Sequence, residues 1–187
     1  MNIKKISLFL LAVIMIFTLA ACKADPIVEE ENDNGNNTNV EEPAPEEKET
    51  TTINLYFANQ EYIMTGDESL DHVIEVKREV ELGEKSVEEV VLEELKKKPE
   101  DENLVTIVEK IKVLDVETKE NIAYVNLSSE NLNGGSMEEM LILNQIVFSL
   151  TDIEGVEGVQ FLVDGQKRET LMGHTVIEEP IKRPDAE

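Results

Sequence analysis

The sequence predicts an α+β domain from about residue 53 to residue 178, in which two helices pack on one face of a mostly antiparallel, mixed sheet. Two observations lead to this class. Residues 86–98 and 136–152 carry apolar side chains at spacings of three and four, the period of one helix face. Short runs rich in Val, Ile and Phe lie before, between and after these segments and are typical of strands. Elements that each have one apolar face need a shared core.

The centre of the predicted fold is a strand, a helix and a strand that follow one another. Ala123–Leu127 forms the first strand. Ser136 begins the helix, and Glu139, three residues later, is its expected partner in a capping box. After the helix, a second strand contains Val156, Val159, Phe161 and Val163. Because all three elements are apolar, we expect them to pack together.

The other elements are predicted from the same kinds of signal. Ser86 and Glu89 form a second capping box at the start of helix 86–98, and Pro99 ends that helix. Arg78 falls on the apolar face of its strand, and its long stem is expected to carry the guanidinium to solvent. The remaining predicted strands are Ile53–Ala58, Tyr62–Met64 after a turn at Asn59–Gln60, Val73–Val80, and a hairpin of Lys110–Val116 with Asn121–Leu127.

Composition limits the classes of partner. The chain has 187 residues, which suits one domain with appendages, and 41 acidic against 17 basic residues give a formal charge of −24. Such a surface repels nucleic-acid phosphate and anionic lipid. There is no Trp and aromatic residues make up 4%, so a platform for stacking bases or sugars is not expected. We therefore predict no nucleic-acid partner.

The N-terminus resembles the signal of a bacterial lipoprotein. Lys4 and Lys5 precede an apolar run, Ile6–Leu19, that is shorter than the roughly 20 residues of a membrane span. The sequence Leu-Ala-Ala then leads to Cys22, the only cysteine, which we predict to be the lipidation site. A diacylglyceryl group supplies two-chain anchoring. The alternative is an uncleaved anchor helix in which the cysteine occurs by chance.

These signals divide the chain into four parts. Residues 1–21 are the predicted signal peptide, and residues 22–52 are the lipidated cysteine and a disordered acidic linker with little to bury. Residues 53–178 are the folded domain, and residues 179–187 are expected to be a flexible tail. The predicted location is the outer face of the bacterial cell membrane.

We predict no catalytic residue, metal site or cofactor. His72 and His174 are interpreted as hydrogen-bonded structural groups, and an envelope hydrolase would require one of them beside a carboxylate in a cleft. Asn144 and Gln145 interrupt an apolar helix and are interpreted as structural, because buried polar side chains need partners. One linker pattern has the spacing of a calcium loop but no flanking helices: Glu30, Asn32, Asn34, Gly35 and Glu41.

A phosphate loop is also not expected. Residues 134–136 read Gly-Gly-Ser before a helix, where backbone N–H groups could in principle hold an anion. The segment lacks the lysine of a phosphate loop, and Glu138 and Glu139 would repel phosphate. We interpret it as a loop that leads into the helix.

Several motifs together resemble the GerMN domain of bacterial sporulation and spore-germination proteins and other bacterial lipoproteins. The resemblance covers roughly Ile53 to Arg183. Two departures are Lys98-Pro99, where family members usually have Gly-Pro, and Ile107-Val108, where an Ile-Pro pair is common. The matching segments are Leu55–Phe57, Tyr124–Ser128, Leu143–Val147, Ser149–Thr151, Val156–Phe161 with Gly165, and Leu171–His174.

The resemblance implies a non-enzymatic, membrane-tethered assembly or interaction module of the cell envelope, including a role in sporulation or germination. The order helix-strand-strand-helix-strand over residues 86–164 is similar to the ring-building motif of envelope channel proteins, so either self-association or a protein partner is expected. The best-known family members carry two such domains, and this chain has one. The alternative is a monomeric ligand-binding or regulatory lipoprotein for an envelope enzyme, although no small-molecule substrate is evident.

Overall fold

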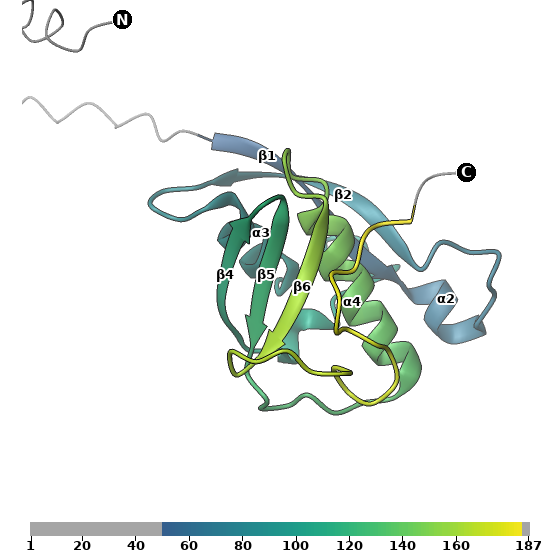
Figure 1. Cartoon of the computed structure of the whole chain (residues 1–187). Helices are drawn as coiled ribbons and strands as arrows, with labels where there is room; N and C mark the ends of the chain where they lie inside the picture. The colour runs from purple at the N-terminus through teal and green to yellow at the C-terminus, as the bar shows by residue number, and fades with distance from the viewer. Residues whose placement is uncertain (1–49, 185–187) are drawn as a thin grey trace, which may run out of the picture. The chain divides into compact units, whose positions relative to one another are not determined.

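The computed structural model describes residues 50–184. Figure 1 shows their arrangement, with the elements labelled along the chain. In order, the elements are β1 (Thr50–Asn59), α2 (Gln60–Thr65), β2 (Val73–Glu81), α3 (Val87–Leu95), β3 (Leu104–Val105), η2 (Val108–Lys110), β4 (Val113–Lys119), β5 (Ile122–Leu127), α4 (Ser136–Leu150) and β6 (Gly158–Val163).

The strands form two three-stranded sheets. The first has the order β2-β1-β3 and is antiparallel throughout. The second has the order β4-β5-β6, in which β4 and β5 form the predicted hairpin and β6 pairs parallel with β5. A parallel pair needs a crossover connection, and α4 supplies it.

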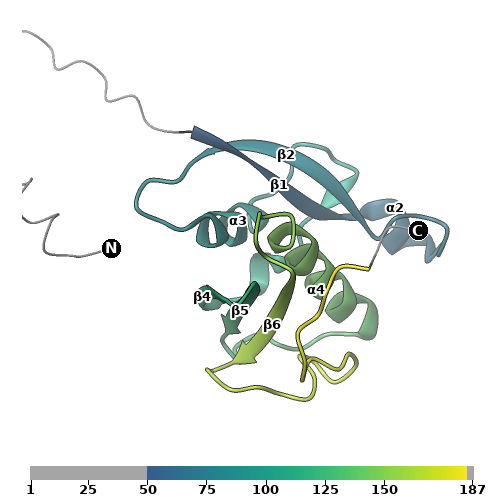
Figure 2. The same ribbon diagram turned by 45° about the horizontal axis from the view of Figure 1, so that its top comes forward.

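The helices α3 and α4 lie between the two sheets, as Figure 2 shows. The α+β class, the presence of both helices, the mostly antiparallel pairing and the element order over residues 86–164 are confirmed. The first helix ends at Leu95 and not at residue 98, so Pro99 lies beyond its end. The arrangement differs in one respect, because the sequence predicts one sheet and the strands form two. Between the sheets, Gln145 and Ser149 of α4 bond the backbone of Tyr56, so they take the place of a further strand at that point on the edge of β1.

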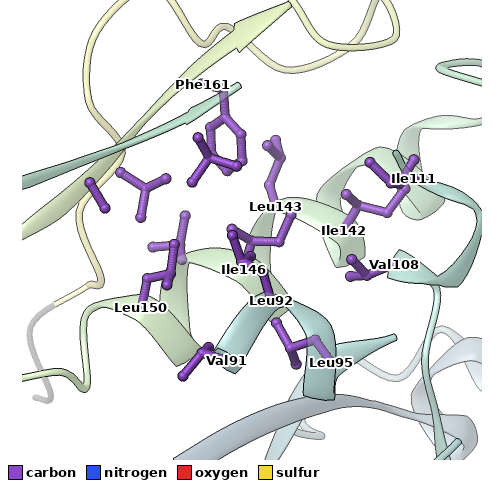
Figure 3. Close-up of a cluster of buried hydrophobic side chains, with 14 of the residues drawn as sticks. Val91, Leu92, Leu95, Val108, Ile111, Ile142, Leu143, Ile146, Leu150 and Phe161 are labelled. Carbon is purple, nitrogen blue, oxygen red and sulfur yellow. The ribbon is translucent and has the colours of Figure 1, made fainter. Parts of the chain in front are cut away.

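The core is one cluster of buried apolar side chains between these layers. Figure 3 shows its centre, where side chains of α3 and α4 meet those of the second sheet and of the segment before β4. Phe161 of β6, Ile146 of α4 and Leu95 of α3 are all fully buried. Close packing of this kind supplies most of the free energy that holds such a domain together.

The segment Tyr62–Met64, predicted to be a strand, is part of the helix α2. Asn59 caps this helix, because its side chain accepts a hydrogen bond from the N–H of Glu61. Gly66 ends it in a left-handed conformation with φ 66°, which glycine adopts without strain. The expected turn at Asn59–Gln60 is thus a helix start, and the strand prediction is wrong.

The two ends of the domain extend beyond their predicted limits. β1 begins at Thr50, so residues 50–52 belong to a strand and not to the linker. At the other end, Ile181 forms an antiparallel bridge with Val159. Arg183 lies over the rings of Tyr56 and Phe148, 4.7 Å from each ring centroid. The start of the predicted flexible tail is therefore part of the fold. The signal peptide, Cys22 and the linker to residue 49 lie outside the described residues.

Arg78 is partly buried and paired, and does not extend freely into solvent as expected. Its Nη1 donates to Glu94 of α3 at 2.8 Å, and its guanidinium lies 5.7 Å from the centroid of the Phe57 ring. The side chains of Arg78 and Glu94 are 22% and 12% exposed. Burial alone would raise the pKa of Glu94, but hydrogen bonds from Lys97 and Arg78 outweigh burial and lower it.

We expect Arg78→Met, which keeps most of the apolar stem, to reduce the free energy of unfolding by about 1–3 kcal/mol at neutral pH. A carboxyl whose pKa is lowered by folding stabilises the folded state above its unfolded pKa, and this contribution is lost as pH falls through the folded pKa. The gap between the variant and wild type should therefore narrow below the ordinary pKa of 4.5. Urea unfolding of both proteins at neutral and acidic pH measures this difference in unfolding free energy.

Lys85→Met is the matched control, because the ion pair of Lys85 with Glu93 is about half exposed, at 51% and 54%. Its expected cost is below about 0.5 kcal/mol. An Arg78→Met deficit that is the same at both pH values would contradict the electrostatic explanation.

Candidate interaction surface

The outer edge of β2 is the longest strand edge that the described part of the chain leaves without a neighbouring strand. β2 pairs with β1 in unbroken register from Val73 to Glu81, and it is the end strand of its sheet. A groove of about 700 Å³ lies against it, closed on the other side by the loop that leads to β3. The groove is lined by residues 74–79 of β2 and by Pro99, Glu100, Asp101 and Leu104.

The groove has an apolar floor and an acidic rim. Ile74 and Val76 are partly exposed, and Leu104 is 8% exposed, so these side chains form the floor. Four carboxylates line the groove, those of Glu75, Glu79, Glu100 and Asp101. Of its two cations, Lys77 lies 4.0 Å from Glu75, and Arg78 is paired with Glu94 outside the lining. The surface is therefore negative beside an open strand edge.

A second, smaller groove of about 170 Å³ lies between α3 and the end strand of the other sheet, β4. Leu92 and Leu114 line it, and Leu114 is 45% exposed. The pairing of β4 with β5 shifts register between Val113 and Asp115, so β4 carries a bulge there. A bulge disrupts the regular row of backbone groups that an incoming strand needs. This edge is less suited to strand pairing than β2.

Each of the two histidines has a hydrogen-bonding partner. The ring of His72 stacks on Tyr62 with 4.1 Å between ring centroids, and its Nε2 lies 3.2 Å from Glu68, a carboxylate on an exposed loop. His72 also borders a shallow hollow of about 280 Å³ with Asn144 and Phe148. The ring Nε2 of His174 lies 3.3 Å from the backbone oxygen of Gly134.

Glu139 has a role that the capping-box prediction missed. Gly135, not Ser136, is the N-cap of α4, and no side chain caps this helix. Glu139 is fully buried and accepts three backbone hydrogen bonds, from Leu171 and Met172 through Oε1 and from His174 through Oε2. A signal for this was present, because Glu139 falls on the buried face of α4 at helical spacing from Ile142, Leu143 and Ile146.

Gln145 is confirmed as a structural residue. It is fully buried, accepts from the N–H of Ile107 at 3.0 Å and donates to the backbone oxygens of Tyr56 and Val105 at 3.3 Å each. One turn later, the Ser149 hydroxyl accepts from the N–H of Tyr56 at 2.9 Å. Its neighbour Asn144 is only partly buried, beside the hollow of His72.

Two other predictions concern ions and membranes. Within residues 50–184, no cluster of three His, Cys, Asp or Glu side chains has an arrangement suited to a metal ion. The linker pattern with calcium-loop spacing lies outside these residues. No helix among residues 50–184 has both the length and the apolar character needed to cross a membrane.

The fold is thus an α+β domain in which two helices lie between two three-stranded sheets. The family model Germane, described as sporulation and spore germination, matches residues 54–169, which is more than half of the chain. The chain belongs to this family, and the resemblance to GerMN domains is confirmed. A search of curated protein sequences found no match.

Two solved structures with TM-scores above 0.5 have the same fold. The first GerMN domain of the sporulation protein GerM from Bacillus subtilis is 18% identical over 72% of this chain and 99% of that one, with a TM-score of 0.57. The tandem GerMN domains of the same protein are 21% identical over 75% of this chain, with a TM-score of 0.56. This chain spans about half of that tandem structure, 47%. A candidate lipoprotein from Clostridium perfringens is 22% identical over 75% of this chain and 92% of that one, with a TM-score of 0.46.

Proposed function

We propose that this protein is a lipid-anchored, non-enzymatic interaction module of the bacterial cell envelope that acts in sporulation or spore germination. The observation that carries the proposal is the open edge of β2, nine residues long and beside an apolar-floored groove, in a member of a sporulation and germination family. Exposed strand edges are common sites of protein recognition.

A different protein is a better partner than a second copy of this chain. The large exposed apolar side chains that the structure describes, Met64, Leu114, Met137 and Val176, do not form one helix face. Most of α4 is buried between the sheets, so its apolar surface is not available for self-association. The formal charge of −24 also opposes association between identical chains.

The anchor is tested by Cys22→Ser. Only a thiol forms the thioether to a diacylglyceryl group, so we expect wild-type chains to incorporate a clickable fatty acid and the serine variant to incorporate none. Lys23→Ser, which changes the adjacent residue, is the matched control and should keep the label. A wild-type chain without label would support the uncleaved anchor helix and overturn the lipoprotein assignment.

The interaction is tested in living cells in the same strains. A photo-crosslinking amino acid is placed at Lys77 on β2, at Leu114 on β4 or at the exposed loop residue Glu154. The proposal expects crosslinks to another protein from Lys77 or Leu114 and none from Glu154. A crosslinked species with twice the mass of the chain would support self-association. Absence of crosslinks from all three positions would favour the monomeric ligand-binding alternative.

A further inference from the structure

The edge of β2 presents a regular template for another strand. Its nine residues pair with β1 without a register shift, and the register shows no bulge. Figure 2 shows β2 on the outer side of β1, with the helices beneath them. An added strand needs a continuous row of backbone N–H and C=O groups about 4.8 Å away from its own. A groove beside β2 provides space for such a strand.

The side chains along β2 specify what an added strand would carry. On one face, Ile74 and Val76 lie partly exposed beside Leu104. On the other face, Glu75 and Glu79 flank Lys77. Because side chains that are opposite each other in neighbouring strands share a face, apolar residues of the incoming strand would meet the first set. Its alternate residues would meet the acidic set, where lysine or arginine is favoured.

The carboxylates of this face are held by hydrogen bonds from neutral side chains. Glu75 accepts a hydrogen bond from the Tyr56 hydroxyl at 3.2 Å, and Glu79 accepts one from the Thr50 hydroxyl at 2.8 Å. Both donors are neutral. Lys77 lies 4.0 Å from Glu75, so the two carboxylates outnumber the one cation between them on this face of β2. The loop carboxylates of Glu100 and Asp101 add negative charge on the far side of the groove. Two copies of this chain would bring two such acidic grooves together, which is unfavourable.

From these observations we infer that the outer edge of β2 binds an extended segment of a partner protein as an added strand, with basic residues alternating with apolar ones. This inference rests on the proposed function, because it names the surface and the partner chemistry of the interaction module. Backbone pairing with β2 would supply affinity, and the alternation of charge would supply selectivity.

The test uses the full chain, purified from membranes in detergent, and a blocked, fluorescent peptide of about eight residues that alternates lysine and valine. The variant is Glu75→Lys with Glu79→Lys. The matched control is Glu154→Lys with Glu169→Lys, which changes net charge equally at exposed sites outside the groove lining. Fluorescence anisotropy measures the affinity, and hydrogen exchange follows the amides of residues 73–81. Circular dichroism checks that both variants are folded.

We expect the peptide to bind wild type and the control variant alike, and to bind the β2 variant at least about tenfold more weakly. A peptide that alternates glutamate and valine should bind the β2 variant more tightly than it binds wild type or the control variant. Bound peptide should slow exchange within residues 73–81. Equal affinity for both variants would indicate general attraction to an acidic chain and overturn the inference, as would unchanged exchange along β2.

Failure of this inference is distinguishable from failure of the proposed function. In one outcome, the peptide does not select the β2 edge, but in cells Leu114 forms crosslinks to a partner protein. The interaction module then stands, and the inferred surface is wrong. Absence of crosslinks at every position, together with absence of peptide binding, would overturn both.

Discussion

Glu139→Ala is expected to reduce the free energy of unfolding by about 3–5 kcal/mol, because it leaves three backbone donors, one buried and two partly buried, without their acceptor. The three N–H groups that Glu139 accepts lie in one short segment, from Leu171 to His174, at 2.9 to 3.1 Å from its oxygens. Leu171 is itself 3% exposed, so water cannot simply replace the carboxylate there.

The effect should be local as well as global. The segment from residue 170 to 177 contains an isolated bridge between Thr170 and Val176, and it contributes Leu171 and Ile177 to the core. Glu139 is the side chain that ties this segment to the start of α4. Without it, amides of residues 171–174 are expected to exchange with solvent far faster than those of β5 and β6.

Urea unfolding measures the loss, and the neighbouring residue provides the control. Glu138 is 35% exposed and forms an ion pair with Lys110 at 2.5 Å, so Glu138→Ala should cost less than about 1 kcal/mol. Glu139→Gln keeps one acceptor oxygen but turns an amide NH₂ toward backbone donors, so its expected cost is between the two. Equal losses for Glu138→Ala and Glu139→Ala would show that the buried hydrogen bonds do not matter.

Glu139 also shows where sequence reasoning stops. The pattern Ser-x-x-Glu occurs at residues 86–89 and again at residues 136–139. At the first position both capping bonds form, between the Ser86 side chain and the N–H of Glu89 and between the Glu89 side chain and the N–H of Ser86. At the second, the glutamate turns inward to a segment 32 to 35 residues away in sequence. A local pattern does not contain that distant segment.

Elements in which the apolar spacing repeats several times were predictable, and short elements were not. Both long helices and β2 were found because many apolar residues repeat at one spacing. Tyr62–Met64 has only three residues, too few to show a period, and its strand-like composition outweighed the helix cap at Asn59. The open edge of β2 follows from which strands pair, so it could not be predicted before the two sheets were known.

Polar side chains of α4 occupy part of the edge of β1, where a further strand would otherwise pair. Gln145 and Ser149 form hydrogen bonds with the backbone of Tyr56, although they follow it in the sequence by 89 and 93 positions. They satisfy backbone groups of β1 that would otherwise need another strand. The sequence indicates that Gln145 needs partners, but only the fold shows that those partners are backbone groups of β1, of β3 and of the loop after β3.

Gln145→Leu, which has similar volume, is accordingly expected to cost about 2–4 kcal/mol of unfolding free energy. The change removes the acceptor for the N–H of Ile107 and the donors to the oxygens of Tyr56 and Val105, and the Gln145 side chain that makes these bonds is fully buried. The apolar side chain of leucine offsets little of this loss, because it leaves the backbone groups unbonded. Thermal and urea unfolding measure the cost.

Asn144→Leu is the matched control, since Asn144 is adjacent on the same helix but partly exposed, and its change should cost less than about 1 kcal/mol.

A double variant that combines Gln145→Leu with Ser149→Ala then tests whether the two side chains act on β1 together. Because the Ser149 hydroxyl also donates to the backbone oxygen of Gln145 at 2.7 Å, we expect the losses to be non-additive by about 0.5–1 kcal/mol. Strict additivity would mean that the two side chains hold the strand edge independently, and a loss for Gln145→Leu no larger than that of Asn144→Leu would contradict the role assigned to this edge.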